Sequence, residues 1–141
     1  MEKELHYELI ESTENYFQIL YKLLQDRKFS ISHEDVPTFE DHKEFVKKHP
    51  YKYWYIISNG KEIIGSFYIN YDNSIGLNLI HQNKKILTEI ITFIKTKFKP
   101  EKPKKSLIPK NFYINVSSQN YELIKIFSDL NILKIQISYE I

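Results

Sequence analysis

The chain has 141 residues, a formal net charge of +2 and no cysteine. The missing cysteine excludes disulfides, thiolate catalysis and cysteine-ligated metal sites, and the near-balanced charge does not by itself indicate nucleic-acid binding. Hydrophobic residues make up 42% and charged residues 27%, which is typical of one globular domain, here residues 1–141. No apolar run reaches the roughly 18 residues of a membrane span. Residues 1–11 hold four glutamates and do not read as a signal peptide, so we expect a cytoplasmic protein.

The first part of the chain predicts one strand followed by two helices. Loose alternation of apolar residues predicts the strand over residues 5–10. The Ser-Thr pair at 12–13 can cap a helix that ends near Arg27, because apolar residues then recur at helical spacing. A second helix can begin at Pro37, whose missing N–H is tolerated in a first turn, and His49-Pro50 ends it.

The middle of the chain predicts an antiparallel meander. Residues 53–57, 63–71 and 74–80 have the composition of strands. Asn59-Gly60 is a strong hairpin signal between the first two, and Asp72-Asn73 predicts the turn before the third.

The last part predicts a helix, a loop, a strand, a helix and a final strand. Isoleucines at helical spacing predict a helix that ends at Phe98, and residues 99–110 read as a loop. A strand follows over 112–116, then a helix opened by the residues at 119–120, then a strand over 133–141. Residues 95–110 also hold seven lysines and one glutamate. They either attract anions or form a solvated helix end, and without interleaved aromatic residues they do not predict a nucleic-acid partner.

The order of elements is therefore β-α-α-β-β-β-α-β-α-β. It predicts an α/β (α+β) fold with a mixed central sheet of about six to seven strands flanked by four helices. A strand, a helix and another strand in succession favour a parallel pair, since antiparallel neighbours need no crossover.

One set of residues is more informative in its combined order and spacing than any of its members is alone. In chain order these residues are Ile31-Ser32-His33, Pro37 to His42, Phe45-Val46, His49-Pro50-Tyr51, Trp54 to Ile57, Gly65-Ser66, Tyr68-Ile69, Ile75-Gly76-Leu77, Asn120, Phe127, Leu130, Gln136 and Tyr139-Glu140. With them, residues 14–141 resemble a bacterial subgroup of the GNAT acyltransferases. These enzymes transfer an acyl group from a coenzyme A thioester to an amine.

The resemblance implies a site for acetyl-CoA as co-substrate. The strand over residues 75–80 would splay from the strand over 112–116, and the pantetheine arm would bond to main chain at Leu77, Asn78 and Leu79. An N–H on that strand would polarise the thioester carbonyl, as in an oxyanion hole. Asn120 would open the helix that flanks coenzyme A, although a plain helix cap explains the same residue equally well.

The expected phosphate-binding loop departs from the GNAT pattern. Gln82 fits its first position, but Lys85 and Leu87 stand where small residues normally let main-chain N–H groups approach a pyrophosphate. Lys84 and Lys85 could instead bind phosphate as point charges, the loop could bind more weakly, or the site could have decayed. Phe127 stands where many of these enzymes have a tyrosine that protonates the thiolate.

On the acceptor side, a base must deprotonate the amine before it attacks. His33 is our first candidate, because its loop would overhang the acceptor pocket, and Glu40 is the second. Ser32, Tyr53 and Tyr68 are candidates for binding the acceptor, with core packing as the alternative for the tyrosines. No pair of histidines has the spacing of helical metal ligands, so we expect no metal site.

Two classes of function are consistent with these features. The first is an N-acetyltransferase that acts on a small amine, including amino sugars by resemblance, through direct attack in a ternary complex. The second is a catalytically inactive GNAT-like module that binds a ligand or a protein. We expect no nucleic-acid or membrane partner, and the final strand could pair two copies into a homodimer through sheet edges.

Overall fold

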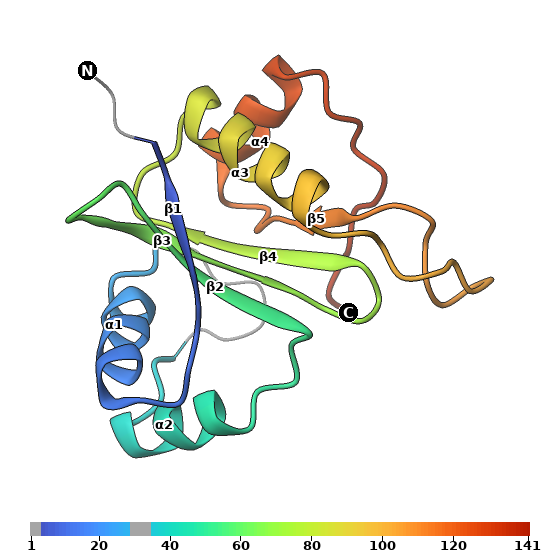
Figure 1. Ribbon diagram of the computed structural model, residues 1–141. Helices are drawn as coiled ribbons and strands as arrows, with labels where there is room; N and C mark the ends of the chain where they lie inside the picture. Colours follow the sequence, from blue (N-terminus) through green and yellow to red (C-terminus); the bar gives the residue numbers. More distant parts are fainter. Residues whose placement is uncertain (1–3, 29–34) are drawn as a thin grey trace.

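The computed structural model describes residues 4–28 and 35–141, and these form one sheet with helices on both faces (Figure 1). The elements in chain order are β1 (His6–Leu9), α1 (Glu14–Gln25), α2 (Phe39–Lys47), β2 (Tyr53–Ser58), β3 (Ile63–Ile69), β4 (Ser74–Leu79), α3 (Lys84–Lys97), β5 (Tyr113–Asn115) and α4 (Tyr121–Asp129). Each lies within two or three residues of its predicted bounds. The four helices that we expected are all among the described residues.

The sheet follows the chain from one edge to the other, in the order β1-β2-β3-β4-β5. The strands from β1 to β4 pair antiparallel, which confirms the predicted meander. Strands β4 and β5 pair parallel, with α3 as the crossover between them. The parallel pair of β4 and β5 is as the strand-helix-strand order predicts. The same order after β5 also favoured a parallel partner, and none is present among the described residues.

Short polar side chains begin three of the helices. The Thr38 hydroxyl accepts from the N–H of Asp41 at the start of α2. The Asn83 amide oxygen accepts from the N–H of Ile86 in α3, and that of Asn120 accepts from the N–H of Leu123 in α4. Each cap satisfies a donor that the first helical turn leaves without a partner.

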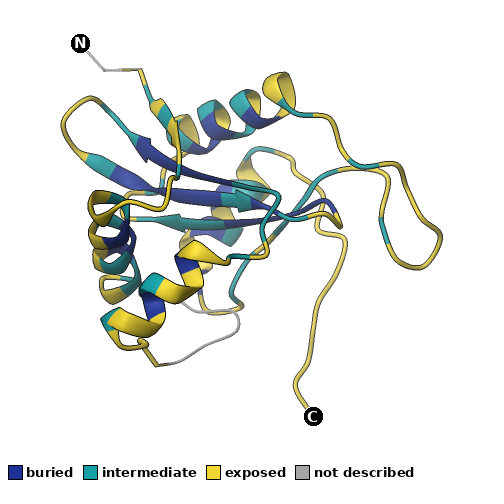
Figure 2. Ribbon diagram, turned by 60° about the horizontal axis from the view of Figure 1, so that its bottom comes forward, coloured by how far each residue is buried: buried dark blue, intermediate teal, exposed yellow. Residues whose placement is uncertain are grey.

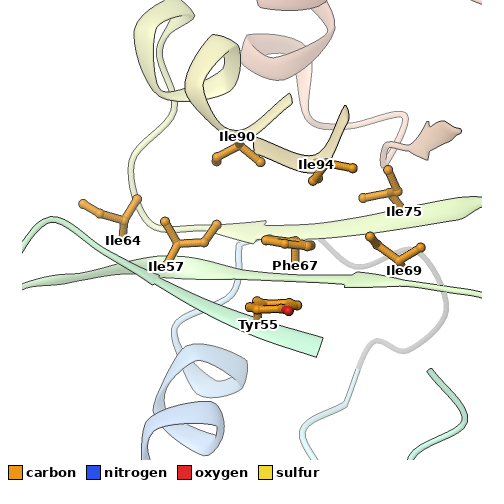
Figure 3. Packing of buried hydrophobic residues seen from close by; sticks show 8 residues of the cluster. All are labelled: Tyr55, Ile57, Ile64, Phe67, Ile69, Ile75, Ile90 and Ile94. Carbon is orange, nitrogen blue, oxygen red and sulfur yellow. The ribbon is translucent and has the colours of Figure 1, made fainter. Parts of the chain in front are cut away.

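The two faces of the sheet carry separate cores. Helix α3 covers one face with Ile90 and Ile94, which pack on the strand residues shown in Figure 3. Helices α1 and α2 lie on the other face, where Phe17, Leu20 and Val46 pack against Trp54 and Ile56 (Figure 1). Alternation along β2 supplies both cores, because successive side chains of a strand point to opposite faces.

The lysine-rich segment after α3 is anchored beside the beginning of β4 and not beside its end. Asn73 is 1% exposed and has a left-handed φ of 71°. Its amide nitrogen donates to the carbonyls of Glu101, at 3.1 Å, and Pro109, at 2.9 Å, while its oxygen accepts from the N–H of Glu101 at 2.7 Å. Lys52 adds an ion pair to Glu101. Asparagine suits this position because it tolerates the left-handed conformation.

The prediction of a strand over residues 133–141 is wrong. The sheet has five strands among the described residues, not six to seven, and residues 133–141 pair with none of them. The segment runs extended and exposed away from the body of the sheet (Figure 2). Alternating apolar residues form a strand only where the edge of a sheet is available for pairing. In this structure residues 133–141 do not lie along such an edge.

Candidate functional site

The candidate site begins where the parallel ladder between β4 and β5 ends. The two strands pair at Ser74–Tyr113, Ile75–Ile114 and Gly76–Asn115, and no further. Strand β4 continues to Leu79, while the chain turns away after β5 toward α4. The strands therefore splay, and the far half of β4 has a neighbour on one side only.

Main-chain groups of β4 face this gap. The N–H of Ile80 donates to Ile64 at 2.7 Å, and the carbonyl of Ser74 accepts from Asn70 at 2.9 Å. In an antiparallel ladder both main-chain groups of a residue point to the same side, and the side alternates along the strand. The even-numbered residues therefore point to β3 and the odd-numbered residues point away from it. The parallel ladder reaches Gly76–Asn115, so the N–H of Leu79, beyond that last pair, is the one that points into the gap.

The gap widens into a cleft of about 200 Å³ at the ends of β4, β5 and α1 and at the beginnings of α3 and α4. Its lining residues are Arg27, Lys28, Leu77, Asn78, Leu79, Ile80, Gln82, Asn115, Val116, Ser117, Asn120, Glu122 and Leu123. The floor is apolar and main-chain in character, whereas the rim is polar and carries charges of both signs. The cleft is smaller than a typical site for a drug-sized ligand, and its polar rim could contact only part of a larger molecule.

Two side-chain amides join the beginnings of α3 and α4 at the rim. Gln82 and Asn120 exchange two hydrogen bonds, each of 3.2 Å. The Gln82 amide nitrogen also donates to a carboxylate oxygen of Glu122 at 3.1 Å. This contact places a negative charge beside the first turn of α3, whose N–H groups otherwise favour an anion.

The cations of the rim come from the end of α1. The amide nitrogen of Asn78, on β4, donates to the carbonyl of Leu23 at 3.2 Å. This hydrogen bond ties the last turn of α1 to the splayed half of β4, and Arg27 and Lys28 then line the cleft. Their positive charge is suited to phosphate or carboxylate groups of a ligand.

A stacked pair of tyrosines lies on the face of the sheet that α1 and α2 cover. The rings of Tyr51 and Tyr68 are 3.9 Å apart and nearly parallel. Tyr68 covers Gly76, where an added Cβ would lie 2.1 Å from the tyrosine ring. Burial raises the pKa of both hydroxyl groups, while the nearby Arg27 guanidinium acts in the opposite direction on each. Both phenols therefore stay protonated at neutral pH.

Five of the residues that we expected to bind coenzyme A lie together in the lining of the cleft: Leu77, Asn78, Leu79, Gln82 and Asn120. Lys84 and Lys85 do not line it. Lys84 lies 3.7 Å from Asp129 of α4 in an exposed ion pair. The hydrogen bond from Lys125, its charge and that of Lys84 lower the pKa of this aspartate.

The residues expected on the acceptor side are not gathered at the cleft. His33 and Ser32 lie outside the described residues. Glu40 is exposed in the first turn of α2 and does not line the cleft. Tyr53 packs against Phe98, at 4.6 Å between ring centroids, which is the core alternative. Phe127, in the position of the expected acid, packs between α3 and α4.

Most of the residues at the rim of the cleft could not be predicted from the sequence. Arg27, Lys28 and Glu122 carry no local signal, because each is an ordinary charged residue of an amphipathic helix or its end. Asn115 and Ser117 were detectable in principle. Asn115 ends β5 and Ser117 follows it, and the residues at and beyond the end of a parallel strand are where such folds bind ligands.

Other kinds of site find no support in residues 4–28 and 35–141. No helix in these ranges has the length and apolar character needed to cross a membrane. They also contain no group of three or more histidine, aspartate or glutamate side chains placed to hold a metal ion.

The mixed sheet, with its four helices, has the α/β fold of solved acetyltransferases. A possible acetyltransferase from Clostridium difficile 630 superposes with a TM-score of 0.55 and 11% identity over 99% of each chain. Spermidine N-acetyltransferase from Vibrio cholerae, in a dodecameric structure, gives a TM-score of 0.55 and 18% identity over 89% of this chain and 77% of its own. No protein-family model matches the chain, and no curated protein matches it in sequence. At these identities the likeness establishes the fold.

Proposed function

We propose that the chain is a single-domain N-acetyltransferase of the GNAT type. It would transfer an acetyl group from acetyl-CoA to the amine of a small molecule. The observation that carries this proposal is the splay of β4 from β5, with the N–H of Leu79 facing the gap. A pantetheine arm is an amide-rich chain, and an unpaired strand edge offers it hydrogen bonds of the kind a neighbouring strand would make.

The chemical step would be direct attack in a ternary complex. The neutral amine attacks the thioester carbonyl, the C–S bond breaks, and coenzyme A leaves as a thiolate. A main-chain N–H of the splayed half of β4 would stabilise the oxyanion that forms. A base would take the proton of the amine, with His33 and Glu40 as the candidates, and water would protonate the thiolate, because Phe127 has no proton to give.

The pyrophosphate of coenzyme A would lie at the beginning of α3. The first N–H groups of this helix have no acceptor within the helix, and Lys84 and Lys85 stand in its first turn. Binding by charge would replace the close main-chain approach that glycines permit. Glu122 opposes it, since its carboxylate lies at the same rim.

The charges at the rim of the cleft favour some classes of acceptor amine over others. Arg27 and Lys28 line the cleft and would repel a polycation such as the spermidine of the Vibrio cholerae enzyme. They would attract an acceptor that carries phosphate, such as a nucleotide-linked amino sugar. We therefore place amino sugars ahead of polyamines among the amines to test.

An inactive GNAT-like binding module is the second candidate. The observation that favours it is the engagement of Gln82, whose amide bonds both Asn120 and Glu122 at the phosphate end of the cleft. A loop without glycine, closed by these contacts, would hold a pyrophosphate poorly. Such a module would keep the fold and lose acetyl transfer.

Calorimetric titration with acetyl-CoA and with free coenzyme A separates these candidates. The enzyme proposal expects micromolar binding and release of the coenzyme A thiol when an accepted amine is added. Lys84→Ala and Lys85→Ala should each weaken binding about 2- to 5-fold, as expected for exposed charges. Lys48→Ala, an exposed lysine of α2 paired with Glu44, is the matched control and should bind as the parent does. Absence of binding at millimolar ligand would overturn the acetyltransferase proposal.

A further inference from the structure

The lysine-rich segment between α3 and β5, residues 99–110, forms a stiff projection that we call the basic arm. It holds five lysines, one glutamate and three prolines, and each proline fixes one backbone angle. At its base, the buried amide of Asn73 bonds to main-chain groups near both ends of the arm. At its tip, the N–H of Ile108 donates to the carbonyl of Lys104 at 2.7 Å, and the N–H of Lys104 donates back at 2.9 Å. Hydrogen bonds at both places give the arm a defined shape without a core of its own.

The basic arm exposes nearly all of its side chains to solvent. It projects from the body of the sheet, in orange in Figure 1, and Figure 2 shows it as exposed along most of its length. At the tip, Leu107 is 67% exposed and follows Ser106, which has a left-handed φ of 68°. The lysines of the arm are all exposed: Lys99, Lys102, Lys104, Lys105 and Lys110. The tip therefore offers one apolar side chain surrounded by positive charge.

The single negative charge of the arm does not cancel this field. Glu101 lies at the base and forms an ion pair with Lys52. Lys95 and Lys97, in the last turn of α3, are also exposed and add positive charge where the arm begins. The whole chain has a net charge of only +2, so the arm concentrates on one small surface a positive charge that the rest of the molecule balances. Such a surface attracts an extended anionic partner.

The side chains of the arm favour an anionic lipid surface over other anionic partners. All of its cations are lysines, whereas arginine is the residue typical of bidentate phosphate recognition and of protein interfaces. The arm has no aromatic ring on which a nucleic-acid base could stack. About four to eight basic residues beside an apolar side chain that enters the headgroup region are the usual composition of a peripheral membrane contact.

We propose that the basic arm binds the protein to the surface of a membrane that carries anionic lipids. Leu107 would enter the headgroup region, and the lysines would lie beside lipid phosphate and carboxylate groups. The arm is anchored beside the beginning of β4, whereas the cleft lies at the end of that strand. A membrane and a ligand would therefore use opposite ends of the sheet. The proposal does not rest on the acetyltransferase function, because no residue of the arm lines the cleft.

This proposal departs from our expectation of no membrane partner. That expectation followed from the lack of an apolar run long enough to span a bilayer. A basic arm lies on the membrane surface and needs no such run, because its affinity comes from charge and from one partly inserted side chain. Of the two interpretations of the lysine-rich segment, the structure thus favours attraction of anions over a solvated helix end.

The test measures binding of the full chain to phospholipid vesicles by flotation. Vesicles of phosphatidylcholine with about 30% phosphatidylserine should bind the protein at about 0.1 M salt and release most of it at about 0.5 M. Vesicles of phosphatidylcholine alone should not bind it. Lys104→Gln with Lys105→Gln should weaken binding about 10- to 30-fold, because each lysine near the surface adds to the affinity. Leu107→Ser should weaken it about 3- to 10-fold through the loss of apolar contact.

A matched control removes the same charge from another surface. Lys22→Gln with Lys48→Gln changes two exposed lysines on the α1 and α2 side, and this variant should bind the vesicles as the parent does. The chain has no cysteine, so Leu107→Cys and Lys48→Cys each provide one site for an environment-sensitive fluorophore. Its emission should shift to the blue on anionic vesicles at the first position and stay constant at the second. All the substituted side chains are exposed, so circular dichroism should show unchanged helix content.

Three outcomes would overturn the proposal. The first is absence of binding to phosphatidylserine vesicles at low salt. The second is an equal loss of binding in the arm variant and in the control variant, which would indicate a diffuse attraction of the whole chain. The third is tighter binding to a single-stranded oligonucleotide or to polyglutamate than to the vesicles, unaffected by Leu107→Ser, which would assign the arm to another class of polyanion.

Discussion

Strand β4 passes through two different environments along its length. Ile75 and Gly76 pair with β3 on one side and β5 on the other, Ser74 bonds to Asn70 just after β3 and pairs with β5, and all three residues are buried. Leu77 to Leu79 pair with β3 alone and are only partly buried. One strand therefore holds the fold together in its first half and presents the main-chain N–H of Leu79 to a cleft in its second half.

The difference shows how a ligand site is made without weakening the sheet as a whole. The first half is also tied to the rest of the chain through Asn73, which holds the segment after α3. The second half is supported from the α1 side, by the hydrogen bond from Asn78 to Leu23. Support from other elements lets the edge of the second half remain unpaired while its position stays defined.

The largest effect on stability is expected when Ile75→Ala is compared with Leu77→Ala. Ile75 is 3% exposed within the core of the α3 face, so its truncation should lower the free energy of unfolding by about 3 kcal/mol. Leu77 is half buried, and its truncation should lower that free energy by about 1 kcal/mol, since part of the side chain is already in water. Urea unfolding of both variants measures the contrast. Equal losses would show that the two halves of β4 are packed alike.

A second prediction concerns Gly76, the last paired residue of the first half. A Cβ at this position would meet the ring of Tyr68 at 2.1 Å, so Gly76→Ala should lower the free energy of unfolding by about 1 to 3 kcal/mol. Tyr68→Ala removes the obstacle. The double variant should therefore lose less stability than the sum of the two single variants. An additive loss, measured by urea unfolding, would mean that the tyrosine moves aside without strain.

The smallest effect is expected at the rim of the second half. Glu122→Gln removes a negative charge beside the first turn of α3 while keeping a side chain that can accept from Gln82. Affinity for coenzyme A should rise by about 2- to 5-fold at low salt, and the gain should shrink as ionic strength increases. Glu44→Gln on α2 is the control and should leave the affinity unchanged. Unchanged affinity in Glu122→Gln would indicate that phosphate binds elsewhere.

The elements of this fold could be predicted because their signals are local. Asn59-Gly60 does lie between β2 and β3, although the loop runs over residues 59–62 and closes through the N–H of Asn59 on the carbonyl of Glu62. Asn120 caps α4 as expected. Caps, turns and periodicity each act within a few residues, so a single sequence contains them in full.

The candidate site could be predicted only on one of its sides. The family resemblance implied a splay beside Leu77 to Leu79, and Gln82 and Asn120 meet near it in the structure. The approach of Arg27 to the same cleft depends on how α1 packs on the far face of the sheet. No spacing in the sequence encodes that approach, because it depends on contacts between distant residues, such as the hydrogen bond from Asn78 to Leu23, 55 positions away.

The sequence by itself determined where the four helices and the five strands of the described sheet lie, that β4 and β5 run parallel, and that the chain contains neither cysteine nor a glycine after residue 76. Only the tertiary structure decided which side chains share the cleft, that Phe127 packs in a core, and that residues 133–141 leave the sheet. The physical reason is that secondary structure responds to neighbours along the chain, whereas a strand forms only against an edge. That edge has to be supplied by the fold.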